Sequence, residues 1–214
     1  MIDAPPPRDA AAAVDDRPVD ADRALLAAHG QRLLDLARAS VLHGFEFGRP
    51  LPVDIGNEEP ALAALRACHV VLRVTSPAAA SDQRWRAGGI RPWRPLLADV
   101  AGNAFAAAFA DRRHAPLKAA DRFDLSIELS LLGSPVAVDL ADPRARARIV
   151  PGRDGVLVEW PGGSLALYPE AWAFRPTPAE FVAEAMRRAL ARGLDPAETP
   201  QVYRFAVASM SDRP

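Results

Sequence analysis

The sequence is short of cysteine and has no long uninterrupted apolar run. Cys68 is the only cysteine among 214 residues, which excludes a disulfide within the chain and a zinc site built from several cysteines. No stretch reaches the roughly eighteen apolar residues of a membrane-spanning helix, so a membrane protein is not expected. The first ten residues, MIDAPPPRDA, lack the basic start and apolar run of a signal peptide. Together these absences predict a cytoplasmic protein.

An excess of charge of either sign is also missing. The 26 basic residues nearly balance the 27 acidic ones, and the formal net charge is −1. A chain without a global positive field does not attract nucleic acid or anionic lipid over its whole surface, so nucleic acid is not expected as a partner. Lys118 is the only lysine, and a compositional bias towards alanine, proline and arginine explains this better than selection for phosphate binding. Any basic function must therefore be local.

Groups of metal-ligating side chains are absent as well. The four histidines are far apart in the sequence, with no HxH or HExxH spacing, so neither a metal site nor a cofactor is expected. Cys68 and His69 are adjacent, but neighbours in a strand point to opposite faces, which argues against a thiolate–imidazole pair. Cys68 is expected to be a small buried residue.

What is present is a mixture of helical and strand patterns behind a polar start. Residues 1–22 hold few large apolar side chains and predict a flexible N-terminal tail. We expect a single α+β domain over residues 23–210 and a short C-terminal tail at 211–214. Apolar residues at three- to four-residue steps predict helices over 23–42 and 96–112. A capping box at Thr177 begins another helix, which should end at Gly193.

Strict alternation of apolar and polar residues makes 125–131 (LSIELSL) the clearest strand. Residues 77–81 are expected to form a mobile tip, and the arginines of 144–148 (RARAR) to lie on a solvated strand edge. Further short strands are predicted over 69–75, 136–138, 156–160, 165–168 and 203–207. Hairpins between such strands require antiparallel pairing. The predicted class is α+β, a mostly antiparallel sheet flanked by helices.

Residues 83–95 (QRWRAGGIRPWRP) combine glycine, arginine, tryptophan and proline, and predict a loop. We call residues 86–94 the Gly/Arg/Trp loop. Its glycines, Gly88 and Gly89, allow positive φ or a close approach of another group. The guanidinium groups of Arg86, Arg91 and Arg94 could surround an anion there, with Trp93 beside them. The alternative is a wide turn with solvated arginines and with tryptophans that cover the core.

Six short segments follow the order found in the AMMECR domain, also called AmmeMemoRadiSam system protein A, and the chain resembles that family over about residues 30–208. The six are residues 33–38 (LLDLAR), 104–117 (AFAAAFADRRHAPL), 128–132 (ELSLL), 152–155 (GRDG), 167–170 (LYPE) and 180–194 (EFV to RGL). The resemblance implies a two-lobed α+β fold. It also implies association with a Memo-family protein and a radical-SAM protein.

The chain departs from the family at its signature loop, LRGCIG. The nearest counterpart is residues 86–91 (RAGGIR), which places Gly89 where the family has cysteine and Arg91 where it has the last glycine. If the family's chemistry needs that thiol, this divergent member cannot perform it.

Three functions stay open from the sequence. The first is a binding or accessory protein that holds a Memo-type or radical-SAM partner, or a small anionic ligand, through the Gly/Arg/Trp loop. The second is a thiol-independent enzyme of the same pathway, with a cleft site that adds Asp111, Tyr168 and Glu170 to the loop arginines. The third is an accessory in RNA modification. Asp111 has the wrong sign for a helix C-terminus, and we expect it to pair with a loop arginine and orient it.

Overall fold

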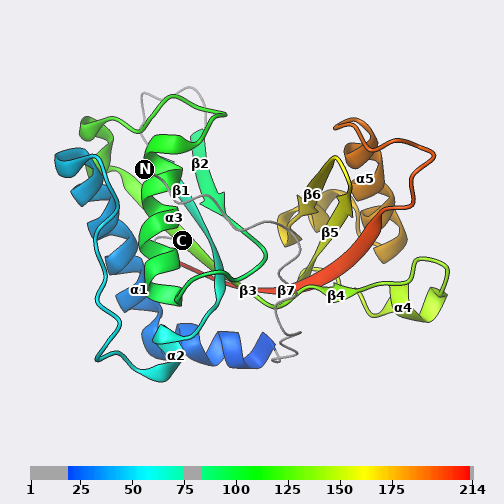
Figure 1. Cartoon of the computed structure of the whole chain (residues 1–214), viewed down its shortest axis with the longest axis horizontal. Coiled ribbons are helices and arrows are strands. Elements are labelled where there is room, and N and C mark those ends of the chain that lie inside the picture. The colour runs from blue at the N-terminus through cyan, green and yellow to red at the C-terminus, as the bar shows by residue number, and fades with distance from the viewer. Residues whose placement is uncertain (1–18, 75–82, 213–214) are drawn as a thin grey trace. The chain divides into compact units, whose positions relative to one another are not determined.

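The computed structural model describes residues 19–74 and 83–212 (Figure 1); residues 1–18 of the predicted tail and the predicted tip at 77–81 lie outside this part. The chain divides into two compact units. Asp20–Leu132, joined by the end of the chain from Ala208, forms the first unit, and Gly133–Val207 forms the second. The strands lie in the order β2 (Gln83–Gly88), β1 (Ala67–Val74), β3 (Leu125–Leu132), β7 (Gln201–Ser211), β5 (Asp154–Trp160) and β6 (Gly163–Leu167), and β4 (Val136–Ala137) pairs with β7. The predicted α+β class with antiparallel pairing is confirmed.

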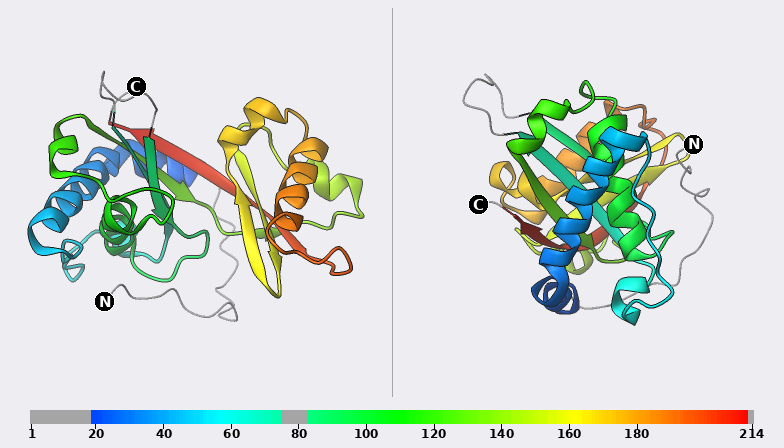
Figure 2. Two further views of the ribbon diagram at one scale, coloured as in Figure 1. Left: turned by 90° about the horizontal axis from the view of Figure 1, so that it is seen from above. Right: turned by 90° about the vertical axis from the view of Figure 1, so that its left-hand side faces the viewer.

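In the first unit, two long helices cover one face of the sheet, as Figure 2 shows on its right. They are α1 (Val19–Phe47) and α3 (Leu96–Ala110). The strands are β1 (Ala67–Val74) in the centre, β2 (Gln83–Gly88) at the edge and β3 (Leu125–Leu132) on the other side. Two short elements, α2 (Pro60–Ala63) and the 3₁₀ helix η1 (Ala119–Phe123), complete the unit.

The apolar stripe predicted for the first helix forms its buried face. Leu33, Ala37 and Val41 are fully buried. The helix is longer than predicted: it begins at Val19, so residues 19–22 are helical and not part of a flexible tail, and it continues to Phe47. Asp22, in its first turn, forms a buried ion pair with Arg66, just before β1. A polar contact with the rest of the unit thus accompanies the extension of the helix at its N-terminal end, and the edge-on contact of Phe45 with Phe109 accompanies it at the C-terminal end.

Residues 83–88 form an edge strand, not the loop that the sequence predicted. Trp85 pairs with Leu72 of β1 and is buried, and its indole Nε1 donates to the carbonyl of Ala115 at 2.7 Å. Arg84 and Arg86 alternate with it and lie on the opposite face of the sheet. The alternation is present in the sequence, but the glycines and prolines that follow indicate a turn more strongly.

The second unit packs α5 (Pro178–Leu190) on the hairpin of β5 (Asp154–Trp160) and β6 (Gly163–Leu167). Its core contains Trp172, from the 3₁₀ helix η2 (Pro169–Phe174), stacked on Phe181 with ring centroids 3.9 Å apart. The predicted capping box is confirmed, since Thr177 and Glu180 bond to each other's backbone N–H groups. The chain leaves the helix through Gly193 at φ +101°.

Three further elements complete this unit: β4 (Val136–Ala137), α4 (Pro143–Ala147) and the first part of β7 (Gln201–Ser211). The strand edge expected at residues 144–148 is wrong, because most of this segment is helix α4. Asp142 accepts a hydrogen bond from the backbone N–H of Arg144 at 2.8 Å, and Pro143 follows it at the first helical position. Along residues 19–74 and 83–212, no helix is long and apolar enough to cross a membrane.

Candidate functional site

The residues proposed from the sequence lie in both units. Arg86 and Gly88 belong to β2, and Gly89 to Arg94 connect β2 to α3. Asp111 directly follows α3, in the same unit. Tyr168 and Glu170 belong to the second unit, where the Tyr168 ring packs edge-on against Phe205 at 5.6 Å. The site described below therefore consists of first-unit residues.

The two glycines of the Gly/Arg/Trp loop have different roles. Gly88 has φ +146°, and a Cβ there would lie 2.4 Å from the carbonyl oxygen of Cys68. Only glycine lets the two strands approach so closely at this point. Gly89 is open, because the nearest atom to a Cβ built there is 4.0 Å away. The position aligned with the family's cysteine therefore has room for a side chain.

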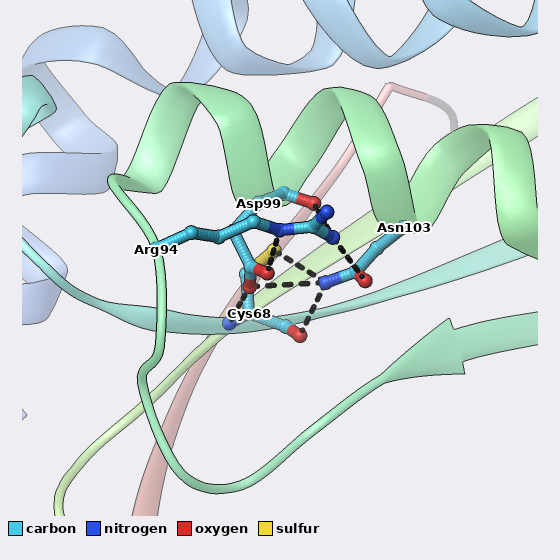
Figure 3. A network of polar contacts seen from close by, with 4 residues as sticks. All are labelled: Cys68, Arg94, Asp99 and Asn103. Atoms are coloured by element: carbon cyan, nitrogen blue, oxygen red, sulfur yellow. Dashed lines mark hydrogen bonds and ion pairs between the residues drawn. The ribbon is translucent and has the colours of Figure 1, made fainter. Parts of the chain in front are cut away.

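A network of polar groups, drawn in Figure 3, fixes the end of the loop to α3. The Nε of Arg94 donates to Asp99 at 2.8 Å, and its Nη2 donates to Asn103 Oδ1 at 3.1 Å. Asn103 Nδ2 donates to the other Asp99 oxygen at 3.0 Å and to the carbonyl of Cys68 at 3.1 Å. The backbone N–H of Cys68 donates to Asp99 at 2.9 Å. One carboxylate thus joins loop, helix and strand.

The guanidinium group of Arg94 lies in a space left by a glycine. A Cβ on Gly102 would come within 2.5 Å of both Nη atoms of Arg94. The guanidinium also stacks on the Trp93 ring, whose centroid is 4.4 Å from Cζ. Arg94 is thus held in place as an anchor of the loop. Asp99 and Asn103, which sequence analysis did not propose, complete this anchor.

Cys68 is buried as predicted. Its side chain has no exposed surface, and Asn103 Nδ2 donates to Sγ at 3.3 Å. Burial, and then the negative charge of Asp99, raise the pKa of the thiol well above its usual value. Thiol chemistry needs an accessible thiolate, so the one cysteine of the chain cannot supply a nucleophile near neutral pH.

Asp111 protects the edge of the sheet at β2. One carboxylate oxygen accepts the backbone N–H of Arg86 at 2.9 Å, and both oxygens accept from the guanidinium of Arg113, at 2.8 and 2.7 Å. Arg113 also donates to the carbonyl of Arg86 at 3.1 Å. The Asp111–Arg113 pair therefore bonds to the edge strand as a neighbouring strand would, which blocks pairing with another chain at this residue.

This arrangement differs from the expected one, in which Asp111 orients a loop arginine side chain. The carboxylate contacts the backbone of Arg86, and its ion-pair partner is Arg113. Burial alone would raise the pKa of Asp111, but hydrogen bonds from Arg113 and from the backbone of Arg86 outweigh burial and lower the pKa to about 2. Asp111 is thus a carboxylate at neutral pH.

His69 lies opposite Gly88 and close to two cations. Its exposed fraction is 8 %. Burial, followed by the positive charges of Arg86 and Arg113, lowers the pKa of His69 to about 4. The imidazole is therefore neutral at pH 7.

We expect His69 to make stability fall with acid in a defined range. The unfolded chain binds a proton at His69 near pH 6.5 and the folded chain only near pH 4, so protons favour unfolding between these values. The loss should approach about 3 kcal/mol by pH 4. Urea unfolding of wild type and His69→Gln from pH 7 to pH 4 measures it, because glutamine does not titrate. Equal slopes for the two proteins would contradict the buried neutral imidazole.

Metal-ligating groups do not gather anywhere along residues 19–74 and 83–212: no three side chains of His, Cys, Asp or Glu lie together as a potential metal site. The groups that the Gly/Arg/Trp loop contains are guanidinium groups, backbone N–H groups and an aromatic ring. Such groups bind anions and planar surfaces through hydrogen bonds and stacking.

Comparison with known proteins agrees with the resemblance drawn from the sequence. The AMMECR1 family matches residues 34–210. The crystal structure of an uncharacterised protein from Pyrococcus horikoshii, PH0010, is similar at a TM-score of 0.74 and 25% sequence identity, over 87% of this chain and 92% of that chain. No curated protein matches. The described fold and the match over most of the chain agree: this protein belongs to the AMMECR1 family.

Proposed function

We propose that this AMMECR1 domain is a non-covalent binding module that holds an anionic group of a Memo-type or radical-SAM partner through the Gly/Arg/Trp loop. The observation that carries the proposal is the anchor beneath the loop. Arg94, Asp99 and Asn103 connect the loop to α3 and β1 by hydrogen bonds of 2.8–3.1 Å. A loop fixed in this way loses little entropy when it binds, which favours recognition.

The groups that would bind the partner are the exposed and half-buried residues of the Gly/Arg/Trp loop. The Arg86 side chain is exposed, and its backbone is held by Asp111 and Arg113. Gly89, three residues further along the chain, is exposed and open, so a partner group can approach the backbone there. Arg91 and Trp93 are half-buried in the same loop. The exposed guanidinium would donate two parallel hydrogen bonds to a carboxylate or phosphate of the partner.

The protonation states of the site favour binding over catalysis. A general acid or base works best with a pKa near the operating pH. The pKa of His69 is lowered to about 4 and that of Asp111 to about 2, both away from neutrality. The Cys68 thiol is protonated and enclosed. An enzyme that uses Tyr168 and Glu170 as well would have to draw its site from both units, and no observation favours that function.

The test is a binding titration with purified Memo-family and radical-SAM proteins from the same organism. Arg86→Ala removes the exposed guanidinium but keeps the backbone bonds to Asp111 and Arg113. Loss of one charge-assisted contact of about 1.5–3 kcal/mol should weaken binding by about 10- to 150-fold. Gly89→Leu should fold normally, because the position is open, and should block the partner sterically.

The matched control is Arg49→Ala, which removes an exposed arginine of the same unit far from the loop in sequence. It should bind like wild type. If both partner proteins bind Arg86→Ala and Gly89→Leu as tightly as wild type, the loop is not the binding surface. If neither partner binds the wild-type protein, the assignment of the partner fails.

A further inference from the structure

A cluster of arginines in the second unit is separate from the Gly/Arg/Trp loop and is not used by it. Three guanidinium groups converge on the carboxylate of Glu184, on α5. Arg187 donates from Nε at 2.9 Å and from Nη2 at 2.7 Å, and Arg188 donates from Nε at 2.7 Å. Arg175, from the segment before the helix, reaches the same carboxylate at 3.5 Å.

The cluster has more positive charge than its own carboxylate can balance. Hydrogen bonds from Arg187, and then from Arg188, lower the pKa of Glu184 to about 2, so Glu184 is ionised at neutral pH. Arginine does not lose its proton in proteins. The cluster thus has one negative and three positive charges, which gives it a net charge of +2. The helix dipole accounts for cations in the last turn of α5, where Arg187 and Arg188 lie, but not for Arg175.

The three arginine side chains are exposed to solvent, and some of their N–H groups are not used by Glu184. Glu184 is 6% exposed, whereas the side chains of Arg175, Arg187 and Arg188 are 44%, 66% and 49% exposed. Glu184 uses only the Nε edge of Arg188, and Nη1 of Arg187 has no partner within the described part of the chain. Arg175 donates from Nη1 to the carbonyl of Phe174 at 2.6 Å. Glu184 therefore neutralises only part of the positive charge, and the outer N–H groups of Arg187 and Arg188 stay available.

We propose that Arg175, Arg187 and Arg188 form a binding site for a phosphate monoester. Such a group has close to two negative charges above pH 7, which matches the excess charge of the cluster, and it offers three acceptor oxygens. Guanidinium groups bind phosphate through paired N–H···O bonds. A phosphodiester, as in an RNA backbone, has one negative charge and fewer free oxygens, so it should bind more weakly.

AMP and cyclic AMP test this directly, because they share a nucleoside and differ in the charge of the phosphate. Isothermal titration at pH 8 and low salt should show AMP bound about tenfold or more tightly than cyclic AMP, and inorganic phosphate should compete with AMP. The double variant Arg175→Gln, Arg188→Gln should weaken AMP binding at least tenfold. Arg192→Gln, which removes an exposed arginine just beyond α5, is the matched control and should bind like wild type.

The variant Glu184→Gln distinguishes a phosphate-binding site from a cluster of ion pairs that serves only stability. It removes the internal negative charge with little change of shape, so a folded Glu184→Gln protein should bind AMP several-fold more tightly. Circular dichroism and thermal unfolding check the fold of each variant. The proposal is overturned if wild type does not bind AMP, if AMP and cyclic AMP bind equally, or if the double arginine variant keeps wild-type affinity. Weaker AMP binding by a folded Glu184→Gln protein would overturn it as well.

Discussion

Alanine in place of Asp99 is expected to lower the free energy of unfolding by about 3–5 kcal/mol. The Asp99 side chain is 5% exposed and bonds to Arg94, to Asn103 and to the backbone N–H of Cys68. Its removal leaves a largely buried guanidinium without its carboxylate and a buried N–H without an acceptor. Urea unfolding followed by tryptophan fluorescence measures the loss, and Trp93, which stacks on Arg94, should report it directly.

The control is Asp35→Ala, which removes an exposed carboxylate of α1 that accepts a hydrogen bond from the exposed Gln31 at 2.9 Å. That change should alter the free energy of unfolding by no more than about 0.5 kcal/mol. A second check is Arg94→Ala combined with Asp99→Ala. Because the two residues share one interaction, the double variant should lose less than the sum of the single losses. Additive losses, or a loss at Asp99 no larger than at Asp35, would contradict the network.

The sequence predicted α3 but not the network built on it. Apolar residues at helical spacing identified the helix over 96–112, close to its observed bounds of Leu96–Ala110. Asp99 and Asn103 are four residues apart and lie on the same side of that helix, a pattern that also fits an ordinary polar face. They are joined to Arg94, whose guanidinium lies where a Cβ on residue 102 would otherwise be, and to the backbone of Cys68. Such a tertiary contact gives no periodic signal.

Residues 83–95 likewise show that sequence patterns do not reveal tertiary contacts: they were identified as unusual, but their strand was not predicted. Composition alone identified residues 83–95 as unusual, and the alternation of Trp85 with arginines was visible in the sequence. Turn signals at Gly88 and Gly89 masked the strand. The role of Asp111 depends on β2 being an edge strand, because only an edge leaves the N–H and C=O of Arg86 without a strand partner. Strand order, not residue type, decides what that carboxylate does.

Asp154→Ala should destabilise the second unit as strongly, by about 3–5 kcal/mol. Asp154 begins β5 and is fully buried. Its carboxylate accepts from Arg153 at 2.6 and 3.0 Å and from the backbone N–H of Val150 at 3.0 Å, and Arg204 lies 3.6 Å away. Alanine would leave two arginines without their shared carboxylate and would release the turn that begins the β5–β6 hairpin.

Hydrogen exchange distinguishes this loss from that of Asp99→Ala. In the described part of the chain, the bonding partners of each carboxylate lie in its own unit. Asp154→Ala should therefore speed amide exchange first in β5, β6 and α5, and Asp99→Ala first in α3 and β1. Asp195→Ala, which removes an exposed turn carboxylate of the second unit, is the control and should leave exchange in β5 unchanged. Identical exchange patterns for the two core variants would instead mean that the shared strand β7 makes both units open as one cooperative structure.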